Sequence, residues 1–541
     1  MKYFFLLPFI LLFQLITAQQ QVSSPKLIVG IVVDQMRNDY IYRYWERYGN
    51  GGFKRLVNEG YYFRNCHYNY IPTYTGPGHC SIYTGTTPRA HGIIANEWFV
   101  KTQGKETYCV LDSAVKTIGS NSKAGQMSPQ HQKSSTIGDE MKISSNGKAK
   151  VFAVALKDRS AILPAGHAAD GAFWFDDASG NFISSSWYMQ ELPGWLKVFN
   201  DKKLPAKYLQ QDWNTLAYPE GYTNSLPDNN PYEGVHNGKD KPTFPYSYKQ
   251  QVESGKWSII KSTPYGNSLT KDLAIECLKS ENLGKDAITD LLSISFSSPD
   301  IIAHTYGPRA MEVEDVYLRL DKDLEELLKS IDQLVGTGQY VVFLTADHGG
   351  ADVPKHLMDN KIPAGYLSES KLFELTNSYL EKTYGEKGLI SSLSNEQIFL
   401  NEKKIAERKL DISVIETDLC KFLVGINGVA EAYPSGVMKF SNFDNNDLRS
   451  LLQNGYNHKM SGNVCIVLNP AWMDYAEKGT THGAGYNYDT HVPLIFFGKG
   501  IAKGETHSYT GITQIAPTIC ELIKINQPNA CISEPLNDKI K

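Results

Sequence analysis

Five stretches of the chain are apolar from one end to the other, without the polar–apolar alternation of a half-buried strand. They are KLIVGIVVD (26–34), KVFAVAL (150–156), DLLSISFSSPD (290–300), QYVVFLTADHGG (339–350) and HVPLIFFG (491–498), and NVCIVLNP (463–470) is a sixth candidate. Strands of this kind are buried on both faces, as in a sheet that helices cover on either side. Amphipathic helices are expected at 309–332 and 513–525. The pattern predicts an α/β fold: an open, mostly parallel sheet sandwiched by helices.

Two regions depart from this pattern. The region at about 200–285 begins with a stretch rich in Pro, Asn, Asp, Gly and Tyr, and the region 365–460 carries mixed polar segments. Both are expected to be insertions that cap one edge of the core. We therefore expect a single catalytic domain over residues 19–541, interrupted by two cap segments.

The overall charge of the chain argues against a nucleic-acid partner. The chain has 541 residues, of which 54 are basic and 58 acidic, giving a net charge of −4. No run of Lys and Arg stands out, so a nucleic-acid partner is not expected.

The N-terminus, MKYFFLLPFILLFQLITAQQ, has one lysine ahead of an apolar run that ends in small residues. This pattern predicts a signal peptide, residues 1–18, cut after Ala18. The alternative is a membrane anchor, which the short run and its interruption by Pro8 and Gln14 disfavour. The mature protein is then periplasmic or secreted, with no stable membrane association.

Eight cysteines in an exported chain allow disulfides. Their pairing cannot be deduced from sequence. Because no CxxC motif occurs, a cysteine zinc cluster is not expected.

Hydroxyl groups gather in the stretch YIPTYTGPGHCSIYTG (70–85). Its glycines and Pro77 end any incoming strand, and the residues after them can open a helix. Thr73 or Thr75 would then lie at a helix N-terminus, where backbone N–H groups and the helix dipole favour an anion. The residues alone allow either a nucleophile loop or an ordinary polar turn.

Metal-type ligands follow several of the predicted strands. Because the carboxyl ends of parallel strands meet at one edge of a sheet, these residues should converge there. Asp300 and His304 lie four apart and share one face of a helical turn, and His482 lies in a loop ahead of a strand. The candidates are Asp34, Asp300, His304, Asp347, His348 and His482. A mixture of carboxylate and imidazole suits zinc better than calcium or magnesium.

Each of these residues also has a simpler interpretation. A single Asp at a strand end is commonly a helix cap or a turn former, and a single His is commonly an ordinary loop or core residue. Four further histidines are weaker candidates: His79, His91, His356 and His491. Of these, His491 is expected to be structural, and His356 could be a peripheral ligand.

Taken together, these motifs resemble the alkaline phosphatase superfamily. The resemblance rests on Asp34 after the first strand, the loop TYTGPGHCSIYTGTTPRAHGI (73–93), D-x-x-x-H at 300–304, ADHG at 346–349 and a late HG at 482–483. It implies that Thr75 is the nucleophile and that Thr73 only shapes the loop. It also implies two zinc ions per chain, one held by Asp34, Asp347 and His348 and the other by Asp300, His304 and His482.

A second set of residues helps decide which branch of the superfamily the chain resembles. No C-x-P-S-R sulfatase motif occurs, and ALKDRSAILPAGHAADGAFWF (155–175) carries Lys157 and Arg159 at the end of a predicted strand. A spacing of two along a strand would aim both side chains the same way; the alternative is a solvated pair.

This pair resembles the phosphate-clamping lysine and arginine of the PafA-type bacterial alkaline phosphatases, and Asn96 matches an asparagine that binds a phosphoryl oxygen. The resemblance implies a monomeric, exported, zinc-dependent hydrolase of small phosphate monoesters that acts through a phosphothreonine. Two alternatives remain open: a nucleotide pyrophosphatase/phosphodiesterase, and a non-catalytic phosphate- or zinc-binding protein.

Overall fold

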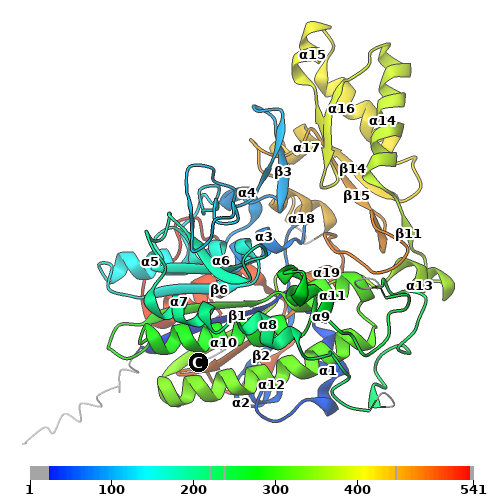
Figure 1. Ribbon diagram of the computed structural model, residues 1–541. Helices are drawn as coiled ribbons and strands as arrows, with labels where there is room; N and C mark the ends of the chain where they lie inside the picture. The colour runs from blue at the N-terminus through cyan, green and yellow to red at the C-terminus, as the bar shows by residue number, and fades with distance from the viewer. Residues whose placement is uncertain (1–23, 219–220, 236–238, 445–446, 537–541) are drawn as a thin grey trace, which may run out of the picture.

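An 11-stranded sheet forms the centre of the molecule (Figure 1). The computed structural model describes residues 24–218, 221–235, 239–444 and 447–536, so the expected signal peptide lies outside it. The strands follow the order β18-β2-β17-β10-β1-β9-β6-β7-β8-β5, and β19 pairs with β2. Their bounds are β1 Leu27–Val33, β2 Tyr61–His67, β5 Thr117–Ile118, β6 Val151–Ala155, β7 Gly171–Asp176, β8 Asn181–Ser185, β9 Asp290–Phe296, β10 Tyr340–Thr345, β17 His491–Gly498, β18 Gly504–Thr506 and β19 Thr510–Gly511.

The middle of the sheet is parallel, which confirms the predicted architecture. Strands β10, β1, β9, β6 and β7 run in one direction, whereas β17 is antiparallel to both of its neighbours. Every residue of β1, β9 and β10 is buried. Such strands need apolar side chains on both faces, which explains their unbroken apolar sequences.

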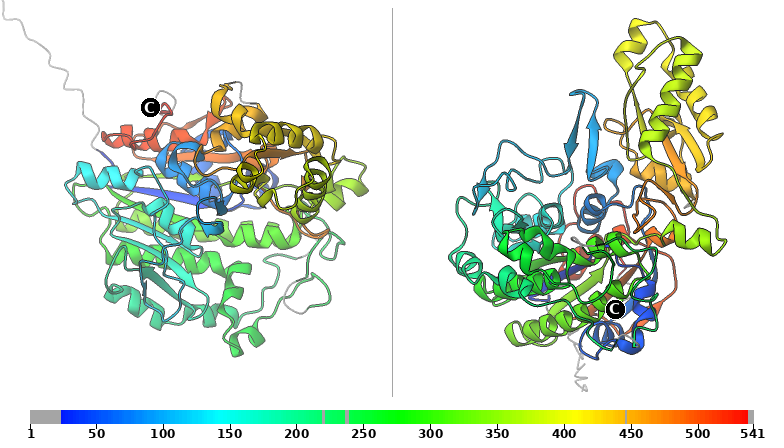
Figure 2. Two further views of the ribbon diagram at one scale, coloured as in Figure 1. Left: turned by 90° about the horizontal axis from the view of Figure 1, so that it is seen from above. Right: turned by 45° about the vertical axis from the view of Figure 1, so that its right-hand side comes forward.

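Helices cover both faces of this sheet (Figures 1 and 2). Helices α10 and α12 pack together on one side, and α3, α6 and α20 lie on the other. Helix α12 carries the amphipathic pattern expected at 309–332. The helices of the core are α1 Asp39–Arg43, α2 Phe53–Glu59, α3 Thr75–Thr84, α4 Pro88–His91, α5 Ile137–Ser144, α6 Asp158–Ala165, α7 Gly194–Asp201, α8 Leu204–Leu209, α9 Lys249–Glu253, α10 Tyr265–Ser280, α11 Ser298–Tyr306, α12 Met311–Leu334, α13 Pro354–Asp359, α19 Asn487–Thr490 and α20 Ile515–Ile523.

A cap stands on one edge of the core, as the yellow and orange lobe of Figure 1 shows. It has its own four-stranded sheet, in the order β12-β13-β15-β14, and its own apolar cluster, which includes Leu380, Ile398 and Leu419. The elements of the cap are α14 Glu369–Tyr384, β12 Ile390–Ser394, β13 Gln397–Leu400, α15 Glu402–Glu407, α16 Ile412–Leu423, β14 Val429–Pro434, α17 Ser435–Phe440, α18 Leu448–Gly455 and β15 Val464–Leu468.

The structure corrects two expectations from the sequence. The candidate strand at 463–470 is β15, which belongs to the cap sheet and not to the core sheet. Apolar content alone does not say which of two cores a strand completes. The end of the region expected as an insertion at about 200–285 contains α10, which packs on β9 and α12 of the core.

A hairpin of β3 (Glu97–Val100) and β4 (Lys105–Tyr108) leans from the core towards the cap. Its strand β3 lies next to β12, and the Asn395 side chain donates to the Glu97 carbonyl oxygen at 2.8 Å. The hairpin therefore ties the cap to the core.

The eight cysteines all lie within the described residues and are free thiols. In the described part of the chain, no helix has both the length and the apolar character that a membrane crossing requires.

Asp321 on α12 holds the N-terminus of α2 from a distance in sequence. Its carboxylate accepts hydrogen bonds from Gly49 N at 2.7 Å and Phe53 N at 2.8 Å, and the side chain is buried. We expect Asp321→Ala to lower the free energy of unfolding by about 2–3 kcal/mol, because two backbone N–H groups lose their acceptor. Glu325→Ala on the same helix removes only a partly exposed pair with Lys329 and should cost about 0.5 kcal/mol or less. Denaturant unfolding of both variants measures this, and equal losses would contradict it.

Candidate metal centre and nucleophile loop

The candidate ligands gather at the carboxyl edge of the sheet, beyond three neighbouring strands. Asp34 follows β1, Asp300 lies in the first turn of α11 after β9, and Asp347 and His348 follow β10. Since β10, β1 and β9 are parallel neighbours, their ends deliver these side chains to one place. His482 enters from the loop ahead of α19 and β17.

Within this edge the six residues form two groups of three. Asp34, Asp347 and His348 make one, and Asp300, His304 and His482 make the other; in each, the candidate ligand atoms lie within 4.8 Å of one another. In the first group His348 Nε2 lies 3.5 Å from Asp34 Oδ1 and 3.6 Å from Asp347 Oδ2. In the second, Asp300 Oδ1 lies 3.1 Å from His304 Nε2 and 3.7 Å from His482 Nε2.

Backbone carbonyl groups set the orientation of all three imidazoles. The Nδ1 atoms of His304, His348 and His482 lie 2.7, 2.9 and 2.7 Å from the carbonyl oxygens of Thr480, Gly349 and Thr73. A carbonyl oxygen only accepts, so each Nδ1 carries a proton, and in the neutral ring each Nε2 has a lone pair that can bind a metal ion.

Electrostatics keep two of these rings neutral. Burial lowers the pKa of His348, and burial together with the neighbouring His348 and His304 lowers that of His482. A neutral imidazole is the form that binds a metal ion. At His304 burial acts in the same direction, but the Asp300 carboxylate outweighs it and raises the pKa.

The carboxylates themselves indicate that a cation belongs here. Asp34 and Asp347 are fully buried, and in the described part of the chain Asp34 Oδ1 and Asp347 Oδ2 accept no hydrogen bond. Burial, with the nearby Asp300 and Asp347, raises the pKa of Asp34. Buried carboxylates are normally paired or bound to metal. These mixed carboxylate–imidazole sets therefore fit divalent metal ions.

Lys157 joins the two groups. Its Nζ donates to Asp34 Oδ2 and to Asp300 Oδ2, both at 2.6 Å. Burial disfavours the ammonium, but Asp300 and Asp34 raise its pKa, so it stays charged.

The spacing argument for Lys157 and Arg159 is wrong. Strand β6 ends at Ala155, and Lys157 is the residue just before α6, of which Arg159 is the second residue. The strand period does not apply, and Arg159 Nη1 instead donates to the Tyr108 hydroxyl at 3.1 Å. Both cations still lie at the carboxyl end of β6, because the turn into α6 follows at once.

Thr75 is the first residue of α3. Its Oγ1 lies 3.5 Å from His348 Nε2, and the side chain is buried. The next residue, Gly76, donates its N–H to Asn96 Oδ1 at 2.7 Å, which leaves the Asn96 NH₂ group as a donor at the helix N-terminus. A Cβ on Gly78 would meet Asp347 O at 2.3 Å, so this turn packs directly on the metal-ligand loop.

The other candidate threonine is engaged elsewhere. Thr73 Oγ1 donates to the Ala484 carbonyl oxygen at 2.9 Å, and its N–H points to Gly483 O. Its hydroxyl thus holds the His482 loop to the nucleophile loop.

Two more residues contact the site: Gln35, which the sequence did not single out, and His79, which it ranked only as a weaker candidate. Gln35 Nε2 donates to Asp300 Oδ1 at 2.7 Å, and Gln35 N donates to Asp347 Oδ1 at 3.1 Å. Its φ of 60° is rare for a non-glycine residue. His79 Nδ1 lies 2.9 Å from Thr75 O and 3.3 Å from Asp347 Oδ2. Only their positions, next to Asp34 and one turn after Thr75, could have singled them out.

The other three weaker candidates, His91, His356 and His491, lie outside both groups. His91 bonds to Ser81 Oγ and accepts from Ile93 N. His491 Nε2 bonds to Arg64 O, and His356 packs on the Tyr232 ring. These contacts are structural.

Comparisons with known proteins agree over nearly the whole chain. The profile of the type I phosphodiesterase / nucleotide pyrophosphatase family matches residues 28–507. Alkaline phosphatase PafA from Elizabethkingia meningoseptica is 41% identical over 527 residues, covering 96% of this chain and 95% of the relative. Alkaline phosphatase PhoV from Synechococcus elongatus is 43% identical over 522 residues, covering 96% and 94%.

A protein named calcium-transporting ATPase, from Myroides odoratus, is 40% identical over 536 residues, covering 97% of this chain and 96% of the relative. Among solved structures, wild-type alkaline phosphatase PafA superposes with a TM-score of 0.93 at 40% identity. That match covers 96% of this chain and 100% of the PafA chain.

We expect His482→Ala to remove one of two bound metal ions, because it deletes a ligand of one group and leaves the other group intact. His491→Ala, at the start of β17, is the matched control because His491 lies outside both groups, and it should retain both ions. Elemental analysis of the purified variants measures the metal content per chain. A wild-type content of one ion, or an equal loss in both variants, would contradict the two-group assignment.

Proposed function

Because the chain belongs to the type I phosphodiesterase / nucleotide pyrophosphatase family and is an enzyme of the alkaline phosphatase superfamily, we propose that it is a zinc-dependent phosphate-monoester hydrolase that acts through a phosphothreonine at Thr75. The proposal is supported mainly by one observation: Thr75, the two candidate ligand groups and Lys157 lie together at one edge of the sheet.

Zinc suits both groups, since it takes carboxylate oxygen and imidazole nitrogen together. Asp34, Asp347 and His348 would hold one ion beside Thr75, and Asp300, His304 and His482 would hold the other. When bound, such ions lower the pKa of oxygen nucleophiles and neutralise charge on attacking and leaving oxygens.

The chain's own residues then carry out the transfer. Thr75 Oγ1 gives up its proton to solvent and attacks phosphorus, and the bond from phosphorus to the leaving oxygen breaks as the new bond forms. The leaving alkoxide takes a proton from water and departs as the alcohol. The N-terminus of α3, at which Thr75 lies, favours the negative charge on the attacking oxygen. Water then cleaves the phosphothreonine, releasing inorganic phosphate and restoring the hydroxyl.

Three side chains orient the phosphoryl oxygens. The Asn96 NH₂ group is presented by its bond to Gly76 N, and Arg159 is held by Tyr108. Lys157 Nζ donates to Asp34 and Asp300, and it would be available to substrate if metal ions bound at those two carboxylates. A crystallised PafA mutant has a threonine, an asparagine, a lysine and an arginine replaced, in that order along the chain. The same residue types occur in the same order here, as Thr75, Asn96, Lys157 and Arg159, which supports these roles.

Lys157 and Arg159 also favour monoesters over the alternative, a nucleotide pyrophosphatase or phosphodiesterase. A monoester carries close to two negative charges at alkaline pH and a diester one. Two extra cations are useful only for the additional anionic oxygen.

We further propose that the protein acts on small phosphate monoesters as a monomer, in the periplasm or outside the cell, after removal of residues 1–18. The apolar run and small residues of that segment support export.

Thr75→Ala should lower kcat/KM for an aryl phosphate about a thousandfold or more, because it removes the nucleophile. Its metal content should be unchanged. Thr73→Ala removes a hydroxyl two residues away that only bonds to Ala484 O, and should cost about tenfold or less. Steady-state kinetics measures both, and a larger loss in Thr73→Ala would disprove the assignment.

Lys157→Ala combined with Arg159→Ala should lower monoester kcat/KM by about two to four decades, at about 1.4 kcal/mol per decade. Diester kcat/KM should fall by about one decade or less, since a diester lacks the extra charged oxygen. The measurement is kinetics on matched aryl mono- and diesters.

The control for charge is Lys403→Ala with Arg408→Ala, two exposed cations on and beside α15 of the cap. It should change neither rate. An equal loss on both esters in the Lys157/Arg159 variant would mean that the pair supports the metals or the fold, and would favour the diesterase alternative.

A further inference from the structure

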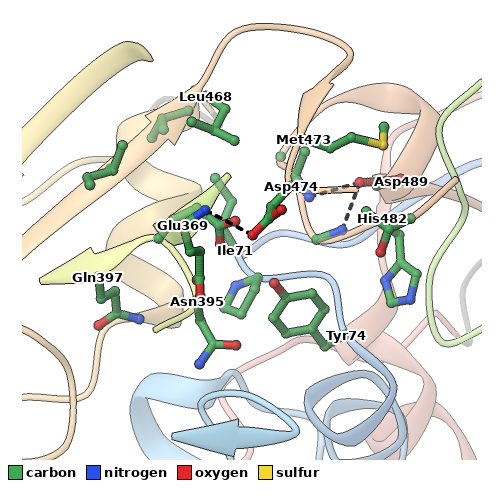
Figure 3. Close-up of a pocket in the computed structure, with 18 of the residues that line it drawn as sticks. Ile71, Tyr74, Glu369, Asn395, Gln397, Leu468, Met473, Asp474, His482 and Asp489 are labelled. Carbon is green, nitrogen blue, oxygen red and sulfur yellow. Dashed lines mark hydrogen bonds between the residues drawn. The ribbon is translucent and has the colours of Figure 1, made fainter. Parts of the chain in front are cut away.

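A cavity of about 380 Å³ opens beside His482, between the core and the cap (Figure 3). Its core wall is formed by Ile71, Pro72 and Tyr74 of the nucleophile loop and by the loop of His482–Gly485. Its cap wall is formed by the turn between β12 and β13 and by the segment Trp472–Asp474. Tyr74 connects the cavity with the site, because its ring packs edge-on against His482 with 5.7 Å between centroids.

The cavity is strongly acidic. Five acidic residues line it: Glu369 and Glu396 are partly buried, and Asp474, Glu97 and Glu106 are exposed. None of the described lining residues is Lys or Arg. Burial, together with Glu369 and Asp474, raises the pKa of Glu396 to about 8. These carboxylates thus lie together without a protein cation to balance them.

Asp489 adds an unpartnered buried oxygen to the lining. Its Oδ2 accepts from Gly483 N at 3.0 Å and from Ala484 N at 2.8 Å. The side chain is fully buried and lines the cavity, and Oδ1 has no hydrogen-bond partner in the described part of the chain. A buried carboxylate oxygen of this kind normally has a donor or a cation beside it.

The cap delivers Glu396 through a turn that is unusual for this residue type. Asn395 and Glu396 connect β12 and β13 with φ angles of 54° and 55°. A two-residue turn of this type favours glycine at its second position. The turn nevertheless directs a carboxylate into the cavity, where it faces the Tyr74 phenol.

We propose that this cavity is a leaving-group subsite that favours phosphate monoesters whose alcohol carries an ammonium group. The inference rests on the proposed function. There the group of Asp34, Asp347 and His348 lies beside the attacking Thr75, so the other group, which contains His482, would serve the leaving oxygen. The alcohol portion would then extend into this cavity, which His482 lines. An ammonium group would offset part of the negative charge of Glu369, Glu396 and Asp474 and would lie against the Tyr74 ring.

An organic cation fits the cavity better than a third metal ion. Among the described residues, only the two catalytic groups bring three candidate ligand atoms within 4.8 Å of one another. The volume is also that of a small-molecule site.

The test compares ω-aminoalkyl phosphates of two, four and six carbons with n-alkyl phosphates of the same lengths. The assay runs at about pH 9, where an alkylammonium group is still charged. The quantity measured is the ratio of kcat/KM for the amine ester to that for the neutral ester. We expect a ratio of about ten or more for at least one length in the wild type. Glu369→Gln combined with Glu396→Gln should bring it close to one at every length.

Glu407→Gln, an exposed carboxylate of α15 in the same cap, is the control and should keep the wild-type ratio. If the double variant does not fold, Glu396→Gln alone is measured in the same way and should lower the ratio severalfold. A wild-type ratio near one at all lengths, or an unchanged ratio in the variants, overturns the subsite. If the wild type hydrolyses neither series, the proposed function fails; if it hydrolyses both series equally, only the subsite fails.

Discussion

Three aspartates that are almost completely shielded from water are the constraint on which the rest of the site depends. Asp34, Asp300 and Asp347 are 0%, 3% and 0% exposed, and Lys157 reaches only two of them. Burying an unpaired carboxylate costs several kcal/mol, and neighbouring like charges add to that cost. A single ammonium therefore leaves a surplus of about two negative charges. Two divalent cations would more than offset it and would leave net positive charge for an anionic substrate.

The fold holds the three carboxylates close together despite their mutual repulsion, because it places them at the ends of rigid strands and helices. Asp34 and Asp347 follow paired central strands, and Asp300 begins a helix that follows a third. The imidazoles are oriented by backbone carbonyls, and Gln35 donates to two of the carboxylates. The ligand on the longest loop, His482, is secured differently: Thr73 bonds to its loop from one side and Asp489 from the other.

The sequence predicts the sheet well because its strands are buried on both faces, and their apolar runs cannot be confused with amphipathic elements. It predicts the metal-ligand candidates because Asp and His directly follow those runs. Sequence patterns do not predict features that depend on which distant segments pack together. Strand β15 has the same apolar character but completes the cap, and the turn after β6 replaces the strand geometry assumed for Lys157. Gln35 and His79 act through hydrogen bonds to residues more than 200 positions away, such as Asp300 and Ser295, which no local pattern encodes.

Together, the cap and the core give the site positive charge at one end and negative charge at the other, which neither would provide alone. At the core end, in the proposed reaction, Lys157, Arg159 and the N-terminus of helix α3 would attract the phosphoryl group. At the other end, Glu396 comes from a cap hairpin and Asp474 from the segment that returns to the core, so the carboxylates assemble only when cap and core are packed together. A substrate that is anionic at one end and cationic at the other, as we propose, would be aligned by both ends at once. The binding energy of the remote end can then serve to orient the reacting end, which is how contacts far from phosphorus contribute to its transfer.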